Sequence, residues 1–406
     1  MKLNKRRVIF INRYFYPDHS ATSQILSDLA FYLSSEGFTI EIVTSRQKYD
    51  DPEADLNRID VVNGVRVNRI KTTRFGRKNL LGRSIDYFSF YLSAFVFLLL
   101  NLHKGDYLVA KTDPPMISIV ASVCSKIKSA TLINWTQDLF PEVAKALDVK
   151  GLSLVYPLLI SLRNYSLKAA YKNIVIGEIM SQRLQYYGID KDKIKVIHNW
   201  SIEENIVPLS ATDNPFREKW ELQGKFIVGY SGNIGRAHDI DTLVGVANSV
   251  KNEKNIVFVI IGGGALYKEF KKQTTDLALN NVFFQPYQPK DVLPYSLTLP
   301  DLHIISLQPE LEGLIVPSKF YGIIASGRPV LYIGDTKGEI PEILHANGCG
   351  KSVNIGDVDS AVKFIEQLFT DRDLAISMGE SSRHLFDEKF NKKLSLKSWG
   401  DLLSSL

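Results

Sequence analysis

The feature that most constrains this chain is a repeated alternation of short apolar runs with longer amphipathic runs. The run "RVIFI" at 7–11 precedes a helical pattern over 23–35, whose apolar residues share one face, and then comes "TIEIVTS" at 39–45. This order predicts a βαβ unit. Strands of a parallel sheet are buried on both faces, so they read as nearly continuous apolar runs. The alternation therefore predicts an α/β fold with a parallel sheet covered by helices.

The pattern occurs twice, which predicts two doubly wound domains in tandem. The first set of later runs is "YLVA", "TLINW", "NIVIG" and "KVIH", and the second set is "FIVGY", "IVFVIIG", "VFF", "LHIIS" and "VLYIG". A chain of 406 residues is long enough for two domains. We expect a first domain over 1–200, a polar connector over 201–224, a second domain over 225–385, and a C-terminal helix over 386–406 that packs back toward the first domain.

Composition excludes several classes of protein. The 49 Lys and Arg against 44 Asp and Glu give a net charge of +5, which suits anionic ligands or an anionic membrane surface and is too weak to indicate nucleic acid. Cys124 and Cys349 are lone thiols without metal-ligand spacing, which suits a reducing compartment. Three Asp-x-Asp pairs fall in polar turns or helix starts, so we expect no metal and no cofactor. The apolar run "VIFI" is too short for a signal peptide, which favours a cytoplasmic protein.

The segment "EGLIVPSKFYGIIASGRPV" at 312–330 predicts a short helix that starts beside a cation. Ser318 is a suitable N-cap, and Ser326–Gly327 closes the helix. A helix N-terminus carries about half a positive charge, so Lys319 there is unfavourable by about 0.3–1 kcal/mol unless an anion lies in front of it. We expect that anion to be a phosphate.

Two glycine-rich turns follow strands of the second domain, where doubly wound domains bind their ligands. In "GYSGNIGRAHD", Gly232 and Gly235 would let the backbone approach an anion that Arg236 neutralises. The turn "IIGGGALYKEF" follows the next strand. Glycines also occur in βα turns that bind nothing, but the coincidence with Lys319 favours an anion site. Residues 1–40 lack a GxGxxG fingerprint, which disfavours a dinucleotide oxidoreductase.

These motifs, together with "FYPDHSATSQILSDLAFYLSSEGF", "NWTQDLFPE" and "NIVIGEIMSQRLQYYGIDKDKIKVIHNW", resemble the GT-B glycosyltransferases of family 4, in particular bacterial surface-polysaccharide enzymes of the colanic-acid and fucosamine-transferase type. The resemblance covers nearly the whole chain. It implies two Rossmann-like domains facing a central cleft, with the acceptor on the first and a nucleotide-sugar on the second. It implies a retaining transfer, with a UDP-linked donor expected, to a lipid-linked sugar in surface polysaccharide or O-antigen biosynthesis.

The resemblance also implies the site residues. Donor-binding positions are Gly232, Asn233, Gly235, Arg236, Gly263, Glu312, Gly313, Leu314, Ser318 and Lys319, and acceptor-binding positions are His19, Ser20, Gln137 and Asp138. The residues expected to be catalytic are Glu312, Asp138, Arg236 and Lys319. Lys319 and the "GNIGR" turn would hold the diphosphate leaving group, where negative charge develops, and Glu312 would contact the donor sugar.

The chain departs from the family at several positions. Gly322 stands where the family has a ribose-binding Glu, Asn233 and His238 stand where many members have Arg and Lys, and Gln137 replaces the usual His. Asp138 has an alternative as a helix-capping carboxylate. Two other functions therefore remain open: a GT-B-fold sugar-nucleotide epimerase, and a noncatalytic partner in a polysaccharide-assembly complex.

Residues 66–102 join a basic segment to an apolar one. Residues 66–83 contain seven Lys or Arg and no acid, and 14 of the 18 residues at 85–102 are apolar. The apolar segment is short of the ~20 residues that span a bilayer, and Asp86 interrupts it. It is either a buried crossover helix after a solvated loop, or a patch on an anionic membrane. The second alternative predicts peripheral association with the inner face of the cell membrane and a polyprenyl-diphosphate-linked acceptor.

Overall fold

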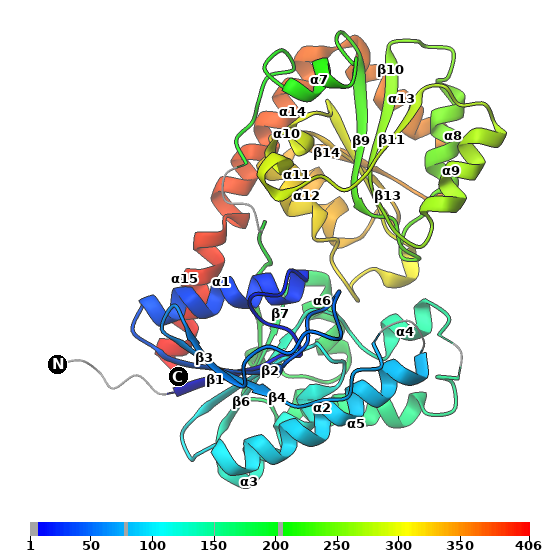
Figure 1. Cartoon of the computed structure of the whole chain (residues 1–406). Helices are drawn as coiled ribbons and strands as arrows, with labels where there is room; N and C mark the ends of the chain where they lie inside the picture. Colours follow the sequence, from blue (N-terminus) through cyan, green and yellow to red (C-terminus); the bar gives the residue numbers. More distant parts are fainter. Residues whose placement is uncertain (1–6, 77–79, 150, 202–205) are drawn as a thin grey trace. The chain divides into compact units, whose positions relative to one another are not determined.

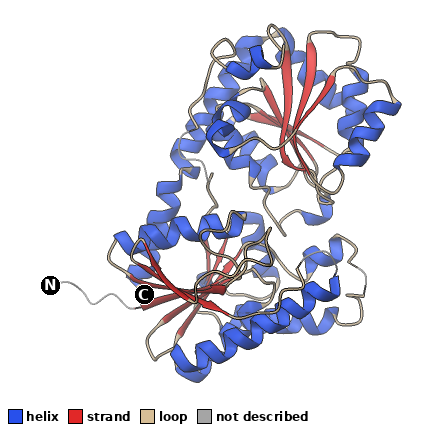
Figure 2. Ribbon diagram, viewed as in Figure 1, coloured by secondary structure: helices blue, strands red, loops and turns tan. Residues whose placement is uncertain are grey.

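The computed structural model describes residues 7–76, 80–149, 151–201 and 206–406. These residues form two compact units (Figure 1). Unit 1 comprises the chain up to His198 together with Lys393–Leu406, and unit 2 comprises Asn199–Lys392. Each unit is a mainly parallel sheet packed against helices (Figure 2), which confirms the predicted α/β class.

The sheet of unit 1 has eight strands in the order β3-β4-β2-β1-β5-β6-β7-β8. The strands are β1 (Arg7–Ile11), β2 (Thr39–Ser45), β3 (Ile59–Val62), β4 (Val65–Ile70), β5 (Tyr107–Lys111), β6 (Thr131–Thr136), β7 (Lys172–Val175) and β8 (Ile194–Val196). Strand β3 pairs antiparallel with β4, and every other pair is parallel. The parallel strands thus follow the Rossmann order, which opens a crevice beside the carboxyl ends of β1 and β5.

The helices of unit 1 cover this sheet. They are α1 (Ala21–Ser35), α2 (Leu80–Asn101), α3 (Ile117–Lys128), α4 (Glu142–Ala146), α5 (Tyr156–Ala169), α6 (Glu178–Tyr186), the short 3-10 helix η1 (Lys191–Lys193) and α15 (Lys392–Ser405). Phe90, Ala94 and Leu98 form the inner face of α2 and pack in the core with strands β1 and β5. The indole of Trp399 in α15 lies 4.8 Å from that of Trp135 in β6. Helix α15 therefore completes the core of unit 1.

A buried carboxylate holds the start of α2 in place. Asp86 is fully buried, and its oxygens accept hydrogen bonds from Arg13 (3.2 Å), the Thr73 hydroxyl (2.6 Å) and the backbone N–H groups of Phe75 (3.1 Å) and Gly76 (3.0 Å). From the sequence alone, Asp86 only interrupts an apolar segment. Its four bonds instead fix α2 to the loop after β1 and to the chain that precedes the helix.

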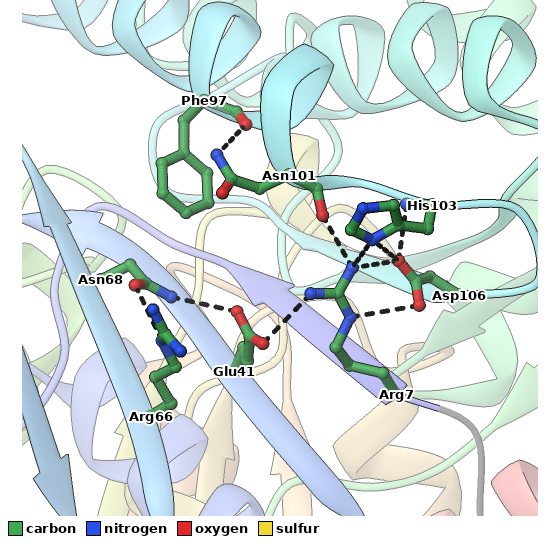
Figure 3. Close-up of polar contacts among 8 residues, drawn as sticks. All are labelled: Arg7, Glu41, Arg66, Asn68, Phe97, Asn101, His103 and Asp106. Atoms are coloured by element: carbon green, nitrogen blue, oxygen red, sulfur yellow. Dashed lines mark hydrogen bonds and ion pairs between the residues drawn. The ribbon is translucent and has the colours of Figure 1, made fainter.

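A second ion-pair cluster ties the amino end of β1 to the end of α2 (Figure 3). The Arg7 guanidinium bonds both oxygens of Asp106, a carboxylate oxygen of Glu41 at 3.1 Å, and the carbonyl of Asn101 at 2.7 Å. The hydrogen bond to Asp106 is the main cause that raises the pKa of Arg7. This cluster lies at the edge of the sheet opposite the carboxyl ends.

The expectation of a solvated, uncompensated basic loop at 66–83 is wrong in part. Residues 65–70 form β4, joined to β3 by a two-residue turn in which Asn63 and Gly64 both have positive φ, the conformation favoured in tight hairpins. The buried Arg69 pairs with Asp60, and Arg74 pairs with Asp55. Both acids lie outside the basic segment in sequence. Two further cations of that segment, at 77 and 78, lie outside the described residues.

Unit 2 contains a six-stranded parallel sheet in the order β11-β10-β9-β12-β13-β14. The strands are β9 (Phe226–Asn233), β10 (Ile256–Gly263), β11 (Val282–Gln285), β12 (Leu302–Ser306), β13 (Val330–Ile333) and β14 (Gly350–Val353). The helices are α7 (Pro215–Lys219), α8 (Asp241–Ser249), α9 (Tyr267–Asp276), α10 (Leu293–Thr298), α11 (Lys319–Ala325), α12 (Glu339–Asn347), α13 (Val358–Thr370) and α14 (Arg372–Leu385), with short helices η2 (Lys290–Val292), η3 (Pro309–Leu311) and η4 (Phe386–Phe390). This is again the Rossmann order, and its crevice lies between β9 and β12.

The segment expected to be a connector belongs to unit 2. It contains α7, and Phe216 and Leu222 pack in a core cluster with Ile227 of β9. The Asn214 side chain accepts a bond from the N–H of Phe216 at 2.9 Å and so caps α7. The polar appearance of this segment reflects its loops, while Phe216 and Leu222 fold inward.

Replacing Asp86 by Ala should destabilise unit 1. The change leaves the buried Arg13 without its carboxylate and leaves two backbone N–H groups without an acceptor, a loss of about 3–5 kcal/mol. Calorimetric unfolding should show a lower melting temperature than for the wild type. Asp50→Ala is the matched control because Asp50 is exposed. Equal melting temperatures for both variants would contradict the role given to Asp86.

Candidate functional site

Lys319 lies at the crevice of unit 2. It is the first residue of α11, and its ammonium donates a hydrogen bond to the Tyr230 hydroxyl and lies 3.8 Å from the centroid of that ring. Tyr230 belongs to β9, so α11 brings the cation to the carboxyl end of the first strand. No ion pair among the residues that the structure describes includes Lys319. A half-buried cation without an acidic partner is suited to an anionic ligand.

Desolvation dominates the electrostatics of this cation. Burial of its ammonium lowers the pKa of Lys319 to about 7. A ring nitrogen of the neighbouring His238, Nδ1, lies 2.7 Å from the carbonyl oxygen of Ser306 in β12. Burial and then the charge of Lys319 lower the pKa of His238 to about 4, so this side chain is neutral near pH 7. Lys319 is therefore the residue that supplies positive charge inside the crevice.

The glycines of the two turns have different roles. Gly232 has a φ of 120°, and a Cβ atom added there would have only Lys319 Cε within 4 Å, at 3.9 Å. Gly264 is tightly packed, because a Cβ atom there would lie 2.6 Å from the carbonyl oxygen of Ile234. The two turns are also joined by a bond from the N–H of Ile234 to the carbonyl of Gly263, at 2.7 Å. Gly232 thus leaves space beside Lys319, while Gly264 is required by the packing of one turn on the other.

The remaining residues of the first turn lie at the surface. Arg236 is exposed and has no acidic partner in the described parts of the chain, so its charge is available to a ligand. Asn233 is exposed too, and its amide nitrogen would lie 2.8 Å from a Cβ atom added at Gly235. Ser318 takes the N-cap position of α11 but has helical backbone angles and makes no side-chain cap bond, so the expected cap is wrong.

Glu312 is more enclosed than its predicted role requires. The side chain is buried, and its carboxylate accepts hydrogen bonds from the Tyr332 hydroxyl and from the N–H of Glu339, both at 2.8 Å. Burial raises its pKa, and these bonds oppose the rise. A Cβ atom at Gly338 would lie 2.3 Å from the carboxyl carbon. Glu312 braces the first turn of α12, and its contact with a donor sugar stays a prediction.

Residues next to Glu312 differ in exposure. Leu314 is buried, and Gly313 has a φ of 69° in the turn that leads toward α11. A Cβ atom at Gly322 would approach Leu297 at 3.4 Å, so the position of the missing family Glu faces α10.

Sequence reasoning missed Tyr287, whose exposed ring lies 3.2 Å from a Cβ atom added at Gly263. The sequence signal for Tyr287 was an aromatic residue two positions after a strand.

The acceptor-binding candidates lie in unit 1, at the carboxyl ends of β1 and β6. His19 is exposed, and Ser20 donates its hydroxyl hydrogen bond to Asp18. Gln137 is buried, whereas Asp138 is exposed. Asp138 makes no hydrogen bond to α4 in the described structure, whose N-cap position is held by Pro141. The alternative of a helix-capping carboxylate is therefore wrong.

Sequence reasoning also missed a buried lysine beneath Asp138. Lys111 ends β5, donates to the carbonyl of Thr22 at 3.0 Å, and lies 3.9 Å from the centroid of the Trp135 ring. Burial lowers its pKa to about 7. Desolvation by the surrounding protein, and then the charge of Asp113, raise the pKa of Asp138 to about 6, although the residue stays open to solvent. The acceptor candidate Asp138 therefore lies near a lysine, and the pKa values of both groups are shifted toward neutral.

Nucleotide binding should depend on pH through Lys319. A bound diphosphate stabilises the ammonium form, so the pKa of Lys319 rises from about 7 in the free protein. Affinity for UDP-glucose, whose diphosphate does not titrate in this range, should be highest at low pH and fall as the pH rises from about 6 to about 9, by at most tenfold per pH unit. Calorimetry in buffers of different ionisation enthalpy should detect proton uptake near pH 7.5, a value about midway in that range.

Lys319→Met is the control for this titration. The variant should bind UDP-glucose more weakly than the wild type and without proton uptake between about pH 6 and about pH 9. A wild-type affinity that stays constant over this range would remove Lys319 from the diphosphate site.

Comparison with known proteins agrees with this geometry. Residues 212–385 match the model of the family described as glycosyl transferases group 1. The chain is 26% identical over 333 residues to the protein named glycosyltransferase WbjE of Pseudomonas aeruginosa, covering 81% of this chain and 82% of that one. It is 25% identical over 195 residues to WcaI of Escherichia coli K12, named as a colanic acid biosynthesis glycosyl transferase, covering 47% and 48% of the two chains.

Solved structures show the same fold. HepE of Anabaena in complex with UDP-glucose superposes with a TM-score of 0.71 at 16% identity, covering 98% of this chain and 100% of that one. The group 1 match lies within unit 2, which carries Lys319 and the glycine turns. The chain is therefore a glycosyltransferase with a group 1 domain and a GT-B fold.

Proposed function

We propose that the protein transfers a sugar from a UDP-linked donor to a lipid-linked sugar acceptor, with retention of the anomeric configuration, in surface polysaccharide biosynthesis. The observation that carries this proposal is the position of Lys319, which has no acidic partner among the described residues, beside the open face of Gly232 at the crevice of unit 2. This arrangement suits a diphosphate. HepE was solved with UDP-glucose, and the name of WcaI refers to colanic acid biosynthesis, which supports the donor and the pathway class.

The proposed reaction places cations where negative charge develops. The bond between the donor anomeric carbon and the diphosphate oxygen breaks, and an acceptor hydroxyl oxygen forms the new bond to that carbon. The acceptor proton leaves with the diphosphate or passes to solvent. Lys319 and Arg236 stabilise the diphosphate as it gains charge, which lowers the barrier more than it strengthens ground-state binding. Glu312 would face the donor sugar, while His19, Ser20, Gln137 and Asp138 would face the acceptor.

Two alternatives keep part of this site. A sugar-nucleotide epimerase would use the same nucleotide site without an acceptor. A noncatalytic partner in polysaccharide assembly is favoured by Gly322 and Gln137, which stand where the family has a Glu and a His. A cation that has no acidic partner among the described residues fits the epimerase as well, because an epimerase also holds the diphosphate, but it gives a noncatalytic partner no role.

We also propose that unit 1 lies on the inner face of the cell membrane through the outer side of α2. Exposed apolar side chains follow one another every three or four residues along this helix, at Leu81, Ile85, Phe88, Leu92, Val96 and Leu100. We call this set the α2 ridge. The neighbouring α3 and the start of α5 add exposed Ile127 and Leu158. Such an unpartnered apolar helix face suits the interface of a bilayer.

The helix is better suited to lie in the interface than to cross it. By length and composition alone, residues 81–101 could span a membrane, and 22% of an apolar 18-residue window in this helix is buried within the protein. Yet the inner face of α2 packs in the core of unit 1, and Asp86 bonds the helix to Arg13. Crossing the bilayer would break both. Because Arg69 and Arg74 pair with acids, apolar contact contributes more to this docking than the sequence suggested.

Release of UDP separates the candidate functions. A transferase should release UDP only when an acceptor is present, and NMR of the product should show the anomeric configuration of the donor. An epimerase should interconvert sugars without releasing UDP. A noncatalytic partner should do neither. Lys319→Ala should lower the rate of release by about 10- to 150-fold, as expected for the loss of one charge-assisted bond of about 1.5–3 kcal/mol. Lys337→Ala, at an exposed lysine of unit 2, should release UDP like the wild type.

Vesicle flotation tests the membrane proposal. The wild type should float with vesicles of anionic lipid at low salt, and replacing Phe88, Leu92 and Val96 of the α2 ridge together by Ser should release it while UDP affinity stays unchanged. Neutralising Arg74, Arg77, Lys78 and Arg83 should reduce binding and its dependence on salt. Ile376→Ser, at an exposed apolar residue of α14, is the control. A wild type that stays unbound at low salt would overturn the proposal.

A further inference from the structure

A groove of about 820 Å³ lies in unit 1 between the C-terminal halves of α3 and α5, at the edge of the sheet where β6 and β7 begin. This edge is opposite the carboxyl ends of the strands, so the groove is separate from the acceptor candidates. Its lining includes three lysines, Lys126, Lys172 and Lys193, and one acid, Asp192. The groove therefore carries an excess of positive charge.

The three lysines keep N–H groups that an anion could accept from. No ion pair among the described residues includes any of them. Lys126 is exposed, and the half-buried Lys172 and Lys193 donate to the backbone carbonyls of Asp192 and Lys168, the second bond at 2.8 Å. An ammonium group has three N–H donors, so a single bond leaves two for a ligand. An anion could bind here without displacing an existing contact.

Helix capping accounts for part of this charge. Lys126 lies in the last turn of α3, and Lys193 bonds a carbonyl in the last turn of α5, where cations are favourable because of the helix dipole. Lys172 begins β7 and bonds a carbonyl of η1, so no long helix explains its position. Two capped helix ends thus leave a third cation at the groove without a structural reason for its charge.

The groove adjoins the apolar face that we propose lies on the membrane. Helix α3 packs against both α2 and α5, so the three helices form one layer over the sheet (Figure 1). On α3 the exposed Ile127 directly follows Lys126, and on α5 the exposed Tyr165 lines the groove itself. Lysine and tyrosine are typical of the boundary between the apolar and aqueous parts of a bilayer. This layer therefore combines the apolar α2 ridge with a cationic groove.

We propose that the groove binds the phosphate of an anionic lipid headgroup, an inference that rests on the proposed membrane association of unit 1. The loop before α2 has less charge to offer such lipids, because Arg69 and Arg74 are paired with acids. The groove supplies ammonium groups and the hydroxyls of the exposed Tyr165 and Tyr171, and phosphate oxygens accept hydrogen bonds from both kinds of donor. The α2 ridge then provides apolar contact, and the groove selects for negative charge.

Binding of the full chain to vesicles tests this inference. The vesicles are made of phosphatidylcholine alone or of phosphatidylcholine with phosphatidylglycerol. A triple variant, Lys126→Gln, Lys172→Gln and Lys193→Gln, removes the charge and keeps an N–H donor at each position. Its affinity for the phosphatidylglycerol vesicles should fall about fivefold for each lysine, or about 100-fold in total, while its affinity for phosphatidylcholine stays unchanged.

A second triple variant is the matched control for net charge. It replaces by Gln three exposed lysines of α9 in unit 2, Lys268, Lys271 and Lys272. The control should bind both kinds of vesicle like the wild type. Lys126→Gln alone, at an exposed residue, should lose about fivefold and serves if the groove triple variant does not fold. Equal losses for the groove and control variants, or unchanged affinity in the groove variants, would overturn the inference.

Calorimetry with inorganic phosphate, in the absence of lipid, separates a lipid headgroup from a free phosphate. Phosphate binding that the groove variant loses, together with its unchanged affinity for vesicles, would assign the groove to a soluble phosphate and overturn the lipid assignment. A wild type that binds UDP but neither kind of vesicle would instead overturn the proposed membrane association. Failure of the wild type to bind UDP would overturn the proposed transfer reaction.

Discussion

Parallel pairing is the constraint on which the rest of both units depends. Each parallel strand must be followed by a crossover, so every turn between a strand and its helix gathers at one edge of the sheet. The Rossmann order then separates the crossovers of two neighbouring strands and opens a crevice between them. In unit 2 this crevice lies between β9 and β12, where His238 meets Ser306. In unit 1 it lies between β1 and β5, where the N–H of Arg13 bonds the carbonyl of Asp113 at 2.6 Å.

In unit 2, the half-buried cation of the crevice is supplied by α11 and not by the first glycine turn. The resemblance to family 4 places Arg and Lys in the first glycine turn, but this chain has Asn233 and a neutral His238 there. Lys319 reaches the same region from α11, on the other side of the crevice. A lysine desolvated without a counter-charge is unfavourable in the empty protein. A bound diphosphate would supply the missing counter-charge. Binding would therefore lower the free-energy cost of keeping the Lys319 ammonium desolvated.

The sequence predicted what depends on local pattern. The alternation of apolar and amphipathic runs predicted both sheets, and Ser326–Gly327 predicted the end of α11, where Gly327 has a φ of 65°. The β3–β4 hairpin was missed, although Asn63–Gly64 is a strong turn signal, because the basic residues around it drew the interpretation toward a loop. The acids that pair with Arg69 and Arg74 come from other segments of the chain, so no window around 66–83 could contain them.

The residues of the candidate site also differ in whether a local sequence pattern reveals them. Gly232, Arg236 and Lys319 could be predicted because each sits in a recognisable turn or helix start. Lys111 was missed because it lies in a strand, where a polar residue gives no local signal of its role. The contacts of Lys111, the carbonyl of Thr22 and the ring of Trp135, come from α1 and β6, and only the folded sheet brings them together.

The return of α15 to unit 1 sets an order on folding during synthesis. The strands of unit 1 up to β8 leave the ribosome first, but Trp399, which covers Trp135, is made only after the whole of Asn199–Lys392. At about 5–20 residues per second, that insertion delays α15 by roughly 10 to 40 s. Unit 2 is one continuous segment, so it can complete its core during this interval. The nascent protein can therefore complete the core of unit 2 before Trp135 in unit 1 gains its final cover.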